Sequence, residues 1–501
     1  MLPISRLPTA MLESITSYPI RYLLPGLLVV ATPLLVRFIQ VFNKNRPSLI
    51  GNMSVAASDH TVVVLGAGYA GVPMAHHLLK HTPAGVVNVR VILVAPNDAL
   101  FWNAASPRGF LPVDNAKSSA NPKGTPGFGD DRLFYDLAPG FAKYNEHDAK
   151  RFKQLLGRAT SLDPDRQTVD VALLAGGEVE TVHYDTILIA TGSDMADGMP
   201  FKIVPHGGTA ETKAALAAYR AQVETASHIV VAGGGMTGVE VAGELGSVYG
   251  SKVVGGPAPG APSSQKKDIV LVINEPLPLG AYSAKDGVRT TAANRLTALG
   301  VRIINNSKVA ASAVDGAKTT LTLVGRDGKQ STLETDVFIP AVGAVVNTQF
   351  LPERLLDTSS QGKRRVRTRA SLQAEGYDNI FVIGDAANLE APSIKNVTQQ
   401  LEVLAPNMQA HLSNWAAACR SGAKQTAGSV ATPPASAPLK EYNVSDTIVF
   451  AVSTGPAGGT GQMGSWKLLS CLIWLFKARF MGTDKAQAYA NGERTFANSK
   501  W

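Results

Sequence analysis

The chain has 501 residues, 45% hydrophobic and only 17% charged, so it is long enough for two or three globular domains and is not a disordered protein. Its two cysteines, Cys419 and Cys471, lie late and far apart, which excludes a disulfide-stapled secreted fold, a thiolate-rich zinc site and a paired redox disulfide. The net charge of +8 is dilute, and we interpret the densest basic run, Lys363–Arg369, as a solvated loop and short strand.

The N-terminal residues 1–56 differ in composition from the rest of the chain. The stretch Tyr22–Val36 has no charged residue and is mostly Leu and Val, with Arg21 before it and Arg37 after it. With the apolar residues beyond Arg37, a membrane-spanning helix of about 20 residues is possible. An acid-poor, arginine-containing N-terminus is equally typical of a cleaved mitochondrial leader. Both interpretations stay open, and either predicts an association with a mitochondrial or other intracellular membrane.

The first predicted structural unit begins with the apolar strand Thr61–Leu65 and continues, after a helix, to a second strand at Val89–Val94. A glycine-rich turn follows the first strand and opens the helix. The residues of this turn are Gly66, Ala67, Gly68, Tyr69, Ala70 and Gly71. Such a turn predicts a dinucleotide site: one glycine allows the tight turn, one the approach of a pyrophosphate, one close packing. The acid expected after the second strand is replaced by Ala95.

A second unit of the same kind follows, with strands at His228–Ala232 and Ile269–Ile273. Its turn contains Gly233, Gly235, Thr237 and Gly238, which we predict to bind a second dinucleotide. Glu275 lies two residues beyond the second strand, and a carboxylate there favours NADH through the ribose hydroxyls, while its offset leaves room for the 2′-phosphate of NADPH. The sequence leaves this choice open.

Three short strands that end in glycine accompany the two turns. Tyr184–Gly192 is a strand that ends in an Ala-Thr-Gly turn, with Thr191 and Gly192 as candidate cofactor contacts. Asp336–Gly343 repeats this pattern approximately. Asn379–Ala386 is an apolar strand that delivers Gly384 and Asp385. Together with two dinucleotide turns, these strands are much more specific than a single glycine motif.

These motifs resemble those of the two-dinucleotide-domain flavoproteins, and specifically the apoptosis-inducing-factor-like branch with its ferroptosis-suppressor-like members. The resemblance covers about Val62–Phe480. It implies that the first turn binds FAD, that the second binds NADH or NADPH, and that Asp385 contacts the ribityl chain. It also implies FAD contacts for Arg108, which ends the segment beginning at Asn103, and for Ala159 on the adenine side.

The C-terminal segment carries further features of this branch. A glycine loop at Gly455–Gln462 precedes the very apolar stretch Trp466–Met481, which the spacing of its leucines predicts to be a helix with a broad apolar face. The resemblance implies that Lys477 lies near a quinone and that Glu240 lies near the contact of nicotinamide and flavin. Lys477 is then a candidate proton donor, although a lysine that extends from an apolar helix to water is the open alternative.

The predicted fold class is α/β, with an FAD domain, an inserted NAD(P) domain and a small C-terminal segment. The predicted parts are an anchor or leader with its linker at 1–56, the first part of the FAD domain at 57–199, and the NAD(P) domain at 200–343. The second part of the FAD domain follows at 344–420, then a linker at 421–438 and the C-terminal segment at 439–501.

The predicted function is that of an FAD-dependent oxidoreductase that passes hydride from NADH or NADPH to a small acceptor, for which a membrane quinone is expected. No metal site is expected, and nucleic acid is not expected as a partner. Two alternatives are a type II NADH dehydrogenase of a respiratory chain and a non-enzymatic, DNA-binding or death-signalling flavoprotein. The basic run Lys363–Arg369 is the only sequence support for the second alternative.

Overall fold

The computed structural model describes residues 59–82, 87–113, 127–251, 266–359, 363–420 and 438–494. The chain divides into two units at Val55, and all described residues belong to the second unit, Ala56–Trp501. The predicted anchor or leader at 1–56 and almost all of the predicted linker at 421–438 lie outside the described residues. Within the described ranges, no helix is both long and apolar enough to cross a membrane.

The first glycine turn follows a strand of a seven-stranded sheet, whose strand order is β18-β8-β1-β2-β5-β6-β7. Strands β1, β2, β8 and β18 and the first part of β5 run parallel, whereas β6 and β7 extend the sheet as antiparallel hairpins. These strands are β1 (Asp59–Leu65), β2 (Asn88–Ala95), β5 (Phe152–Asp163), β6 (Thr168–Leu173), β7 (Val179–His183), β8 (Thr186–Ile189) and β18 (Ile380–Val382). The side chains of β1, β8 and β18 are mostly buried, because these strands are covered on both faces. Helices α3 (Gly71–His81) and α10 (Ile394–Arg420) pack on one face, and the chain at Leu351–Leu356 packs on the other.

A second, four-stranded parallel sheet has the order β12-β11-β10-β16. Its parts lie in the sequence between β8 and β18, so it is inserted into the first sheet's chain segment, and the predicted α/β class with two Rossmann-like sheets is confirmed. The segment boundaries given above stay a prediction. The elements of this region are α7 (Thr209–Thr225), β10 (His228–Ala232), α8 (Met236–Tyr249), β11 (Asp268–Val272), α9 (Asp286–Ala298), β12 (Arg302–Ile304), β16 (Val337–Pro340) and the meander β13 (Ser307–Asp315), β14 (Lys318–Gly325) and β15 (Gln330–Thr335).

The two crossings between these regions pair with each other. Strand β9 (Ser193–Met195) leaves the first sheet and β17 (Ala344–Val346) returns to it, and the two form an antiparallel pair. Asn347 reinforces the crossing, because its Nδ2 donates to the carbonyl of Thr191 at 3.2 Å and to Asp194 Oδ1 at 2.9 Å. The crossings therefore meet beside the Ala-Thr-Gly turn that the sequence predicted at Thr191 and Gly192.

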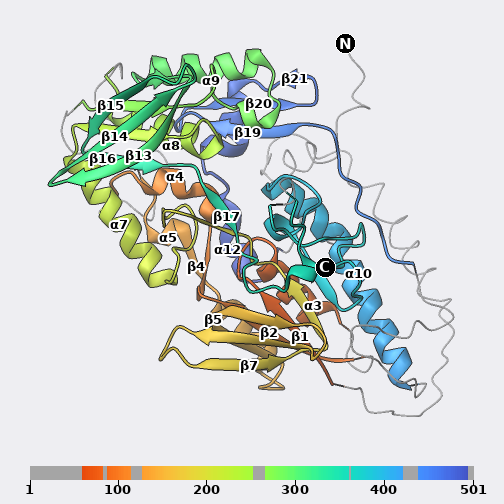
Figure 1. The fold of residues 1–501 in the computed structure, drawn as a ribbon. Helices are drawn as coiled ribbons and strands as arrows, with labels where there is room; N and C mark the ends of the chain where they lie inside the picture. The colour runs from red at the N-terminus through yellow and green to blue at the C-terminus, as the bar shows by residue number, and fades with distance from the viewer. Residues whose placement is uncertain are drawn as a thin grey trace, which may run out of the picture. The chain divides into compact units, whose positions relative to one another are not determined.

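The C-terminal segment packs on the second sheet's helices. Strand β19 (Val449–Ser453) contacts α8 and β20 (Gly459–Met463) contacts α9, while α12 (Thr483–Ala490) returns to α3 (Figure 1). The expectation of one helix over Trp466–Met481 needs correction: Trp466–Lys467 form strand β21, and helical structure begins with α11 (Ser470–Ile473) and continues as the π-helix Trp474–Ala478. The physical reason is the tight turn at Gly464, whose φ of +57° lets Trp466 pair with Met463.

Shorter elements complete the described chain around these units. They are β3 (Ala99–Phe101), a 3₁₀ turn at Asn103–Ala105, α4 (Ser106–Gly109), α5 (Asp130–Leu133), β4 (Phe134–Asp136), α6 (Ala138–Ala142) and 3₁₀ turns at Lys143–Asn145, Gly280–Tyr282, Glu353–Leu355 and Gly384–Ala386. The basic run Lys363–Arg369 forms isolated bridges to neighbouring loops, and its arginines are engaged within the fold. Arg367 and Arg369, for example, pair with Glu375 and Asp378 at 3.3 and 2.9 Å.

A buried polar chain connects α10 to the central strands. His60 Nε2 lies 2.9 Å from Thr186 Oγ1, and the same hydroxyl lies 2.9 Å from His411 Nε2. Burial lowers the pKa of His60 to about 3, with a smaller effect from the His411 imidazole, and burial lowers the pKa of His411 to about 4. Both imidazoles are therefore neutral in the folded protein at neutral pH.

We expect the folded protein to lose stability as the pH falls from 7 to 5. Unfolded histidine has a pKa of about 6.5, so in this window the unfolded chain binds protons that the folded chain excludes. Each buried histidine then costs on the order of 2 kcal/mol of unfolding free energy at pH 5. Urea unfolding at both pH values measures the loss, which should shrink by about that amount in His60→Gln. The same loss in His60→Gln as in the parent would contradict the assignment.

Candidate active site

A cavity of about 790 Å³ opens at the carboxyl ends of the parallel strands of the seven-stranded sheet. This is the edge at which open α/β sheets bind their ligands, and the volume is that of a small-molecule or cofactor site. Most of the residues predicted for the first cofactor line it, namely Gly66, Ala67, Gly68, Tyr69, Ala70, Ala159, Thr191, Gly192, Gly384 and Asp385.

The glycines of the first turn differ in what surrounds them. A Cβ on Gly66, which has a φ of +107°, would lie 2.3 Å from the carbonyl oxygen of Ala190, and one on Gly71 would lie 1.8 Å from that of Gly66. A Cβ on Gly68 would meet nothing within 4 Å. Gly66 and Gly71 therefore allow a tight strand–helix turn, whereas Gly68 leaves open space in the cavity at the start of α3. A pyrophosphate fits this arrangement of a glycine backbone and a helix N-terminus.

Asp385 lines the same cavity from the 3₁₀ turn that follows β18. Its Oδ2 accepts a hydrogen bond from Ser193 Oγ at 2.6 Å and lies 3.7 Å from the ammonium of Lys202. Both partners also line the cavity. The carboxylate is thus oriented by a hydroxyl and a cation, and it remains at the cavity wall, where it can accept hydrogen bonds from the hydroxyls of a bound cofactor.

Asn97 lies two residues after Ala95, which replaces the acidic residue expected at the end of β2. It is buried, lines the cavity, and its Nδ2 donates to the carbonyls of Ala67 and Ala99 at 3.1 and 2.7 Å. The amide therefore holds the glycine turn in place, and sequence reasoning missed it because the motif leads one to look only for a carboxylate. Ala159 lines the same cavity from β5.

The second glycine turn repeats the geometry of the first. A Cβ on Gly233, with a φ of +130°, would lie 2.8 Å from the carbonyl oxygen of Ala341, and one on Gly238 would lie 2.0 Å from that of Gly233. A Cβ on Gly235 would meet only the Tyr282 hydroxyl at 3.4 Å. Thr237 follows in the first turn of α8 and is partly exposed. The middle glycine is again the open one, as a pyrophosphate at this helix N-terminus requires.

Glu275 carries a charge partner that the sequence did not suggest. Its carboxylate lies 3.0 Å from Arg326 Nη2 and 3.9 Å from Arg289 Nη2. Glu275 and Arg326 are both about half exposed at the end of the second strand of this unit. A carboxylate suits the ribose hydroxyls of NADH and a guanidinium suits the 2′-phosphate of NADPH, so both recognition groups are present.

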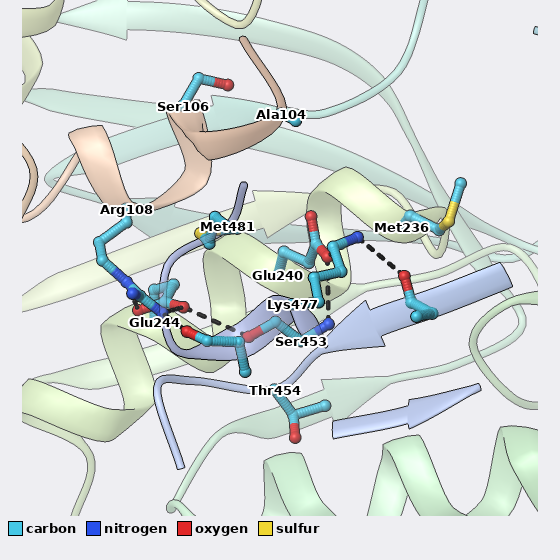
Figure 2. A network of polar contacts seen from close by, with 12 residues as sticks. Ala104, Ser106, Arg108, Met236, Glu240, Glu244, Ser453, Thr454, Lys477 and Met481 are labelled. Atoms are coloured by element: carbon cyan, nitrogen blue, oxygen red, sulfur yellow. Dashed lines mark hydrogen bonds and ion pairs between the residues drawn. The ribbon is translucent and has the colours of Figure 1, made fainter. Parts of the chain in front are cut away.

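Arg108, for which the resemblance implies an FAD contact, is held by partners within the protein, and the FAD contact stays a prediction. Arg108 does not line the cavity; its guanidinium binds Glu244 of α8 through two bonds, Nε to Oε2 at 2.9 Å and Nη2 to Oε1 at 2.6 Å (Figure 2). It also donates to the carbonyls of Ala478 and Arg479 at 2.7 and 3.3 Å. The reason is that a buried guanidinium needs a counter-charge and acceptors for its donors, and Glu244 and these carbonyls supply them.

The structure brings Glu240 and Lys477 together. Lys477 Nζ lies 2.6 Å from Glu240 Oε1 and donates to the carbonyl of Ala451 at 2.8 Å (Figure 2). The backbone amide of Ser453 donates to the same carboxylate oxygen at 3.1 Å. The Glu240 side chain is only 6% exposed and that of Lys477 is 26% exposed. The pair therefore joins the second dinucleotide helix to the C-terminal segment, with the ammonium on its more accessible side.

Glu244 and Ser453 were not predicted as site residues from the sequence. Glu244 lies four residues after Glu240, hence on the same face of α8, and this spacing was the only available signal. Ser453 carries no signal of its own, because it acts through a backbone amide and through a hydroxyl 3.4 Å from Glu244 Oε1.

Comparisons with known proteins agree with this geometry. The pyridine nucleotide-disulphide oxidoreductase family matches residues 60–422. The chain is 30% identical to the oxidoreductase ptaL of Pestalotiopsis fici over 82% of this chain and 94% of that protein. It is 26% identical to ferroptosis suppressor protein 1 of Taeniopygia guttata, over 85% and 94%. The solved sulfide:quinone oxidoreductase of Aquifex aeolicus superposes with a TM-score of 0.59 at 15% identity over 86% and 92%, which shows the fold alone.

The family name refers to a disulphide, but this chain's cysteines do not supply one. Cys419 is half-buried in α10 and Cys471 is exposed in α11, and the two are not joined to each other. The enzymatic features of the chain are instead the two glycine turns and the cavity that the first turn lines. The match over 60–422 makes the chain a member of the pyridine nucleotide-disulphide oxidoreductase family, an enzyme that works with FAD and with NADH or NADPH.

Proposed function

We propose that this enzyme belongs to the ferroptosis-suppressor-like branch of its family and passes reducing equivalents from NADH or NADPH to a quinone at a membrane surface. The observation that supports the proposal is the Lys477–Glu240 pair, in which an ammonium of the C-terminal segment binds a carboxylate of α8. The ferroptosis suppressor protein among the relatives supports the assignment to this branch.

The residues that would hold FAD are those that line the cavity. The backbone around Gly68 and the start of α3 suit the pyrophosphate, Asp385 suits the ribityl hydroxyls, and Ala159 and Asn97 would contact the adenosine part. Thr191, Gly192 and Gly384 complete the wall. The chemistry supplied by bound FAD is acceptance of hydride from the dinucleotide and delivery of electrons to the acceptor.

Lys477 and Glu240 would manage the proton of the second half-reaction. Conversion of a quinone to a quinol by a hydride donor requires one proton beyond the hydride, so a proton donor near the acceptor lowers the barrier. The Lys477 ammonium carries such a proton on the accessible side of the pair. Glu240 holds this ammonium in position and attracts a replacement proton after transfer.

The chain shortly before Lys477 carries four exposed apolar side chains, which we together call the C-terminal apolar face. It consists of Trp466 (74% exposed), Leu469 (63% exposed), Trp474 and Phe476. Residues 447–483 contain three basic residues and no acidic one. Tryptophan, aliphatic side chains and basic residues together are the composition of a surface that rests in the headgroup region of an anionic bilayer. A quinone dissolved in lipid would then lie close to Lys477.

Replacement of Trp466 and Leu469 by glutamate is expected to lower turnover with a long-chain quinone in anionic vesicles about tenfold or more, because burial of a charge opposes docking. Turnover with a short, water-soluble quinone should stay within about twofold. Val314→Glu, at another exposed apolar side chain on β13, serves as the matched control. Equal losses with both quinones would argue against docking by this face.

The proposed hydride transfer is tested by the visible spectrum of the purified protein, mixed with NADH or NADPH without oxygen. We expect a flavin spectrum that bleaches with either dinucleotide, because Glu275 and Arg326 offer recognition groups for both. Arg326→Met should slow bleaching by NADPH about tenfold and leave bleaching by NADH within about twofold, since only NADPH carries the 2′-phosphate. A flavin that stays oxidised with both dinucleotides would overturn the proposal.

A further inference from the structure

Two acid–base pairs lie one helical turn apart on the same face of α8. Glu240 pairs with Lys477, and Glu244 pairs with Arg108 (Figure 2). The Arg108 and Glu244 side chains are only 4% and 0% exposed. Four charges are thus gathered within one turn of a buried helix. Such burial is expensive unless each charge has a fixed partner, so the choice of partners within this group matters.

We propose that Arg108 is a positioning residue, which directs Lys477 to Glu240 by occupying Glu244 and by fixing the backbone that follows Lys477. The inference rests on the proposed role of Lys477. Arg108 is not among the residues that line the cavity, and its hydrogen bonds go to Glu244, Ala478 and Arg479.

The first part of the argument is the assignment of partners. Glu240 and Glu244 both contact Ser453 of the C-terminal segment, and an ammonium is a point charge without the geometry to select one carboxylate over the other. The planar guanidinium of Arg108 matches both oxygens of Glu244, which a lysine does not do. With Glu244 occupied in this way, Glu240 is the carboxylate left for Lys477.

The second part is the position of the backbone. The π-helix Trp474–Ala478 ends directly after Lys477, and the last carbonyls of a helix lack intrahelical partners. Arg108 donates to two carbonyls there, those of Ala478 and Arg479. A cation at a helix C-terminus is also favoured by the helix dipole. These bonds fix the end of the segment that carries Lys477.

Close packing between the backbones of α8 and the C-terminal segment also fixes how the two lie against each other. A Cβ on Gly243, between the two glutamates, would lie 2.7 Å from the backbone of Thr454. Ser453, the preceding residue, donates its amide to Glu240 and places its hydroxyl 3.4 Å from Glu244 (Figure 2). The C-terminal segment therefore lies directly on the face of α8 that carries both carboxylates, and a small shift of the segment would move Lys477 relative to Glu240.

The test is a double-mutant cycle of Arg108→Lys with Lys477→Met, with Arg166→Lys at an exposed site as the matched control. Arg108→Lys keeps the positive charge and removes the guanidinium that bonds both oxygens of Glu244. We expect it to lower quinone turnover about tenfold to a hundredfold in the parent and less than about twofold in Lys477→Met, with flavin reduction by NADH unchanged. Equal losses in both backgrounds would overturn the inference.

A second measurement does not depend on turnover. The rate of reductive methylation of Lys477, followed by mass spectrometry, reports how firmly its ammonium is held. We expect this rate to rise about tenfold in Arg108→Lys and in Glu244→Gln, provided that each retains its flavin absorbance, and to stay at the parent value in Arg166→Lys. An unchanged rate in both variants would overturn the inference. If Lys477→Met keeps full turnover, the proposed proton donation fails, and the methylation rate alone decides whether Arg108 positions Lys477.

Discussion

Gly68→Asp is expected to abolish FAD binding while the fold is retained. The position opens into the cavity, and a Cβ there has no protein atom within 4 Å, so the first carbon of the new side chain is accommodated without a clash. Its carboxylate would face the pyrophosphate, and two like charges about 4 Å apart in a partly buried site repel by about 4 kcal/mol, which weakens binding on the order of a thousandfold.

The measurement is the flavin absorbance per protein after purification, together with far-UV circular dichroism. Gly287→Asp is the matched control, because Gly287 also has open space around it but lies in the exposed first turn of α9, where an acid is favourable. Normal flavin content in Gly68→Asp would show that the first glycine turn does not hold the pyrophosphate.

Lys477→Met is expected to lower turnover with a quinone by about a hundredfold or more, the range of general acid catalysis. Methionine keeps much of the length and apolar stem of lysine and removes its proton and charge. The reduction of flavin by NADH should change less than about twofold, because that half-reaction needs no proton from Lys477. Steady-state turnover and anaerobic stopped-flow reduction measure the two halves separately.

Lys485→Met provides the control, since Lys485 is an exposed lysine of α12. Glu240→Gln should also lower turnover, because the neutral amide holds the ammonium less firmly. If Lys477→Met slowed reduction by NADH and left the reaction with the quinone unaffected, Lys477 would belong to the dinucleotide site and the proposed proton donation would be wrong.

Contacts between residues that are far apart in the chain do not follow from a local motif. Arg108 was predicted at the FAD, and the structure pairs it with Glu244 and with carbonyls near residue 479. No local pattern indicates this partner, because the choice depends on which acceptors the folded chain leaves unsatisfied around a buried guanidinium. The helix predicted over Trp466–Met481 was likewise shortened by a hairpin, in which pairing between Trp466 and Met463 competes with helical structure.

The sequence by itself determined the two glycine turns, the apolar parallel strands around them and hence the α/β class. These features are local: a glycine is needed where φ is positive or a Cβ would strike a carbonyl, as at Gly66 and Gly71, and a buried strand needs a run of apolar side chains. Only the tertiary structure decided that β18 forms an edge of the first sheet, that Lys477 pairs with Glu240, and that Arg108 pairs with Glu244. Such pairings join residues far apart in the chain, and they are selected by burial and by competition among charged partners, which no stretch of sequence contains alone.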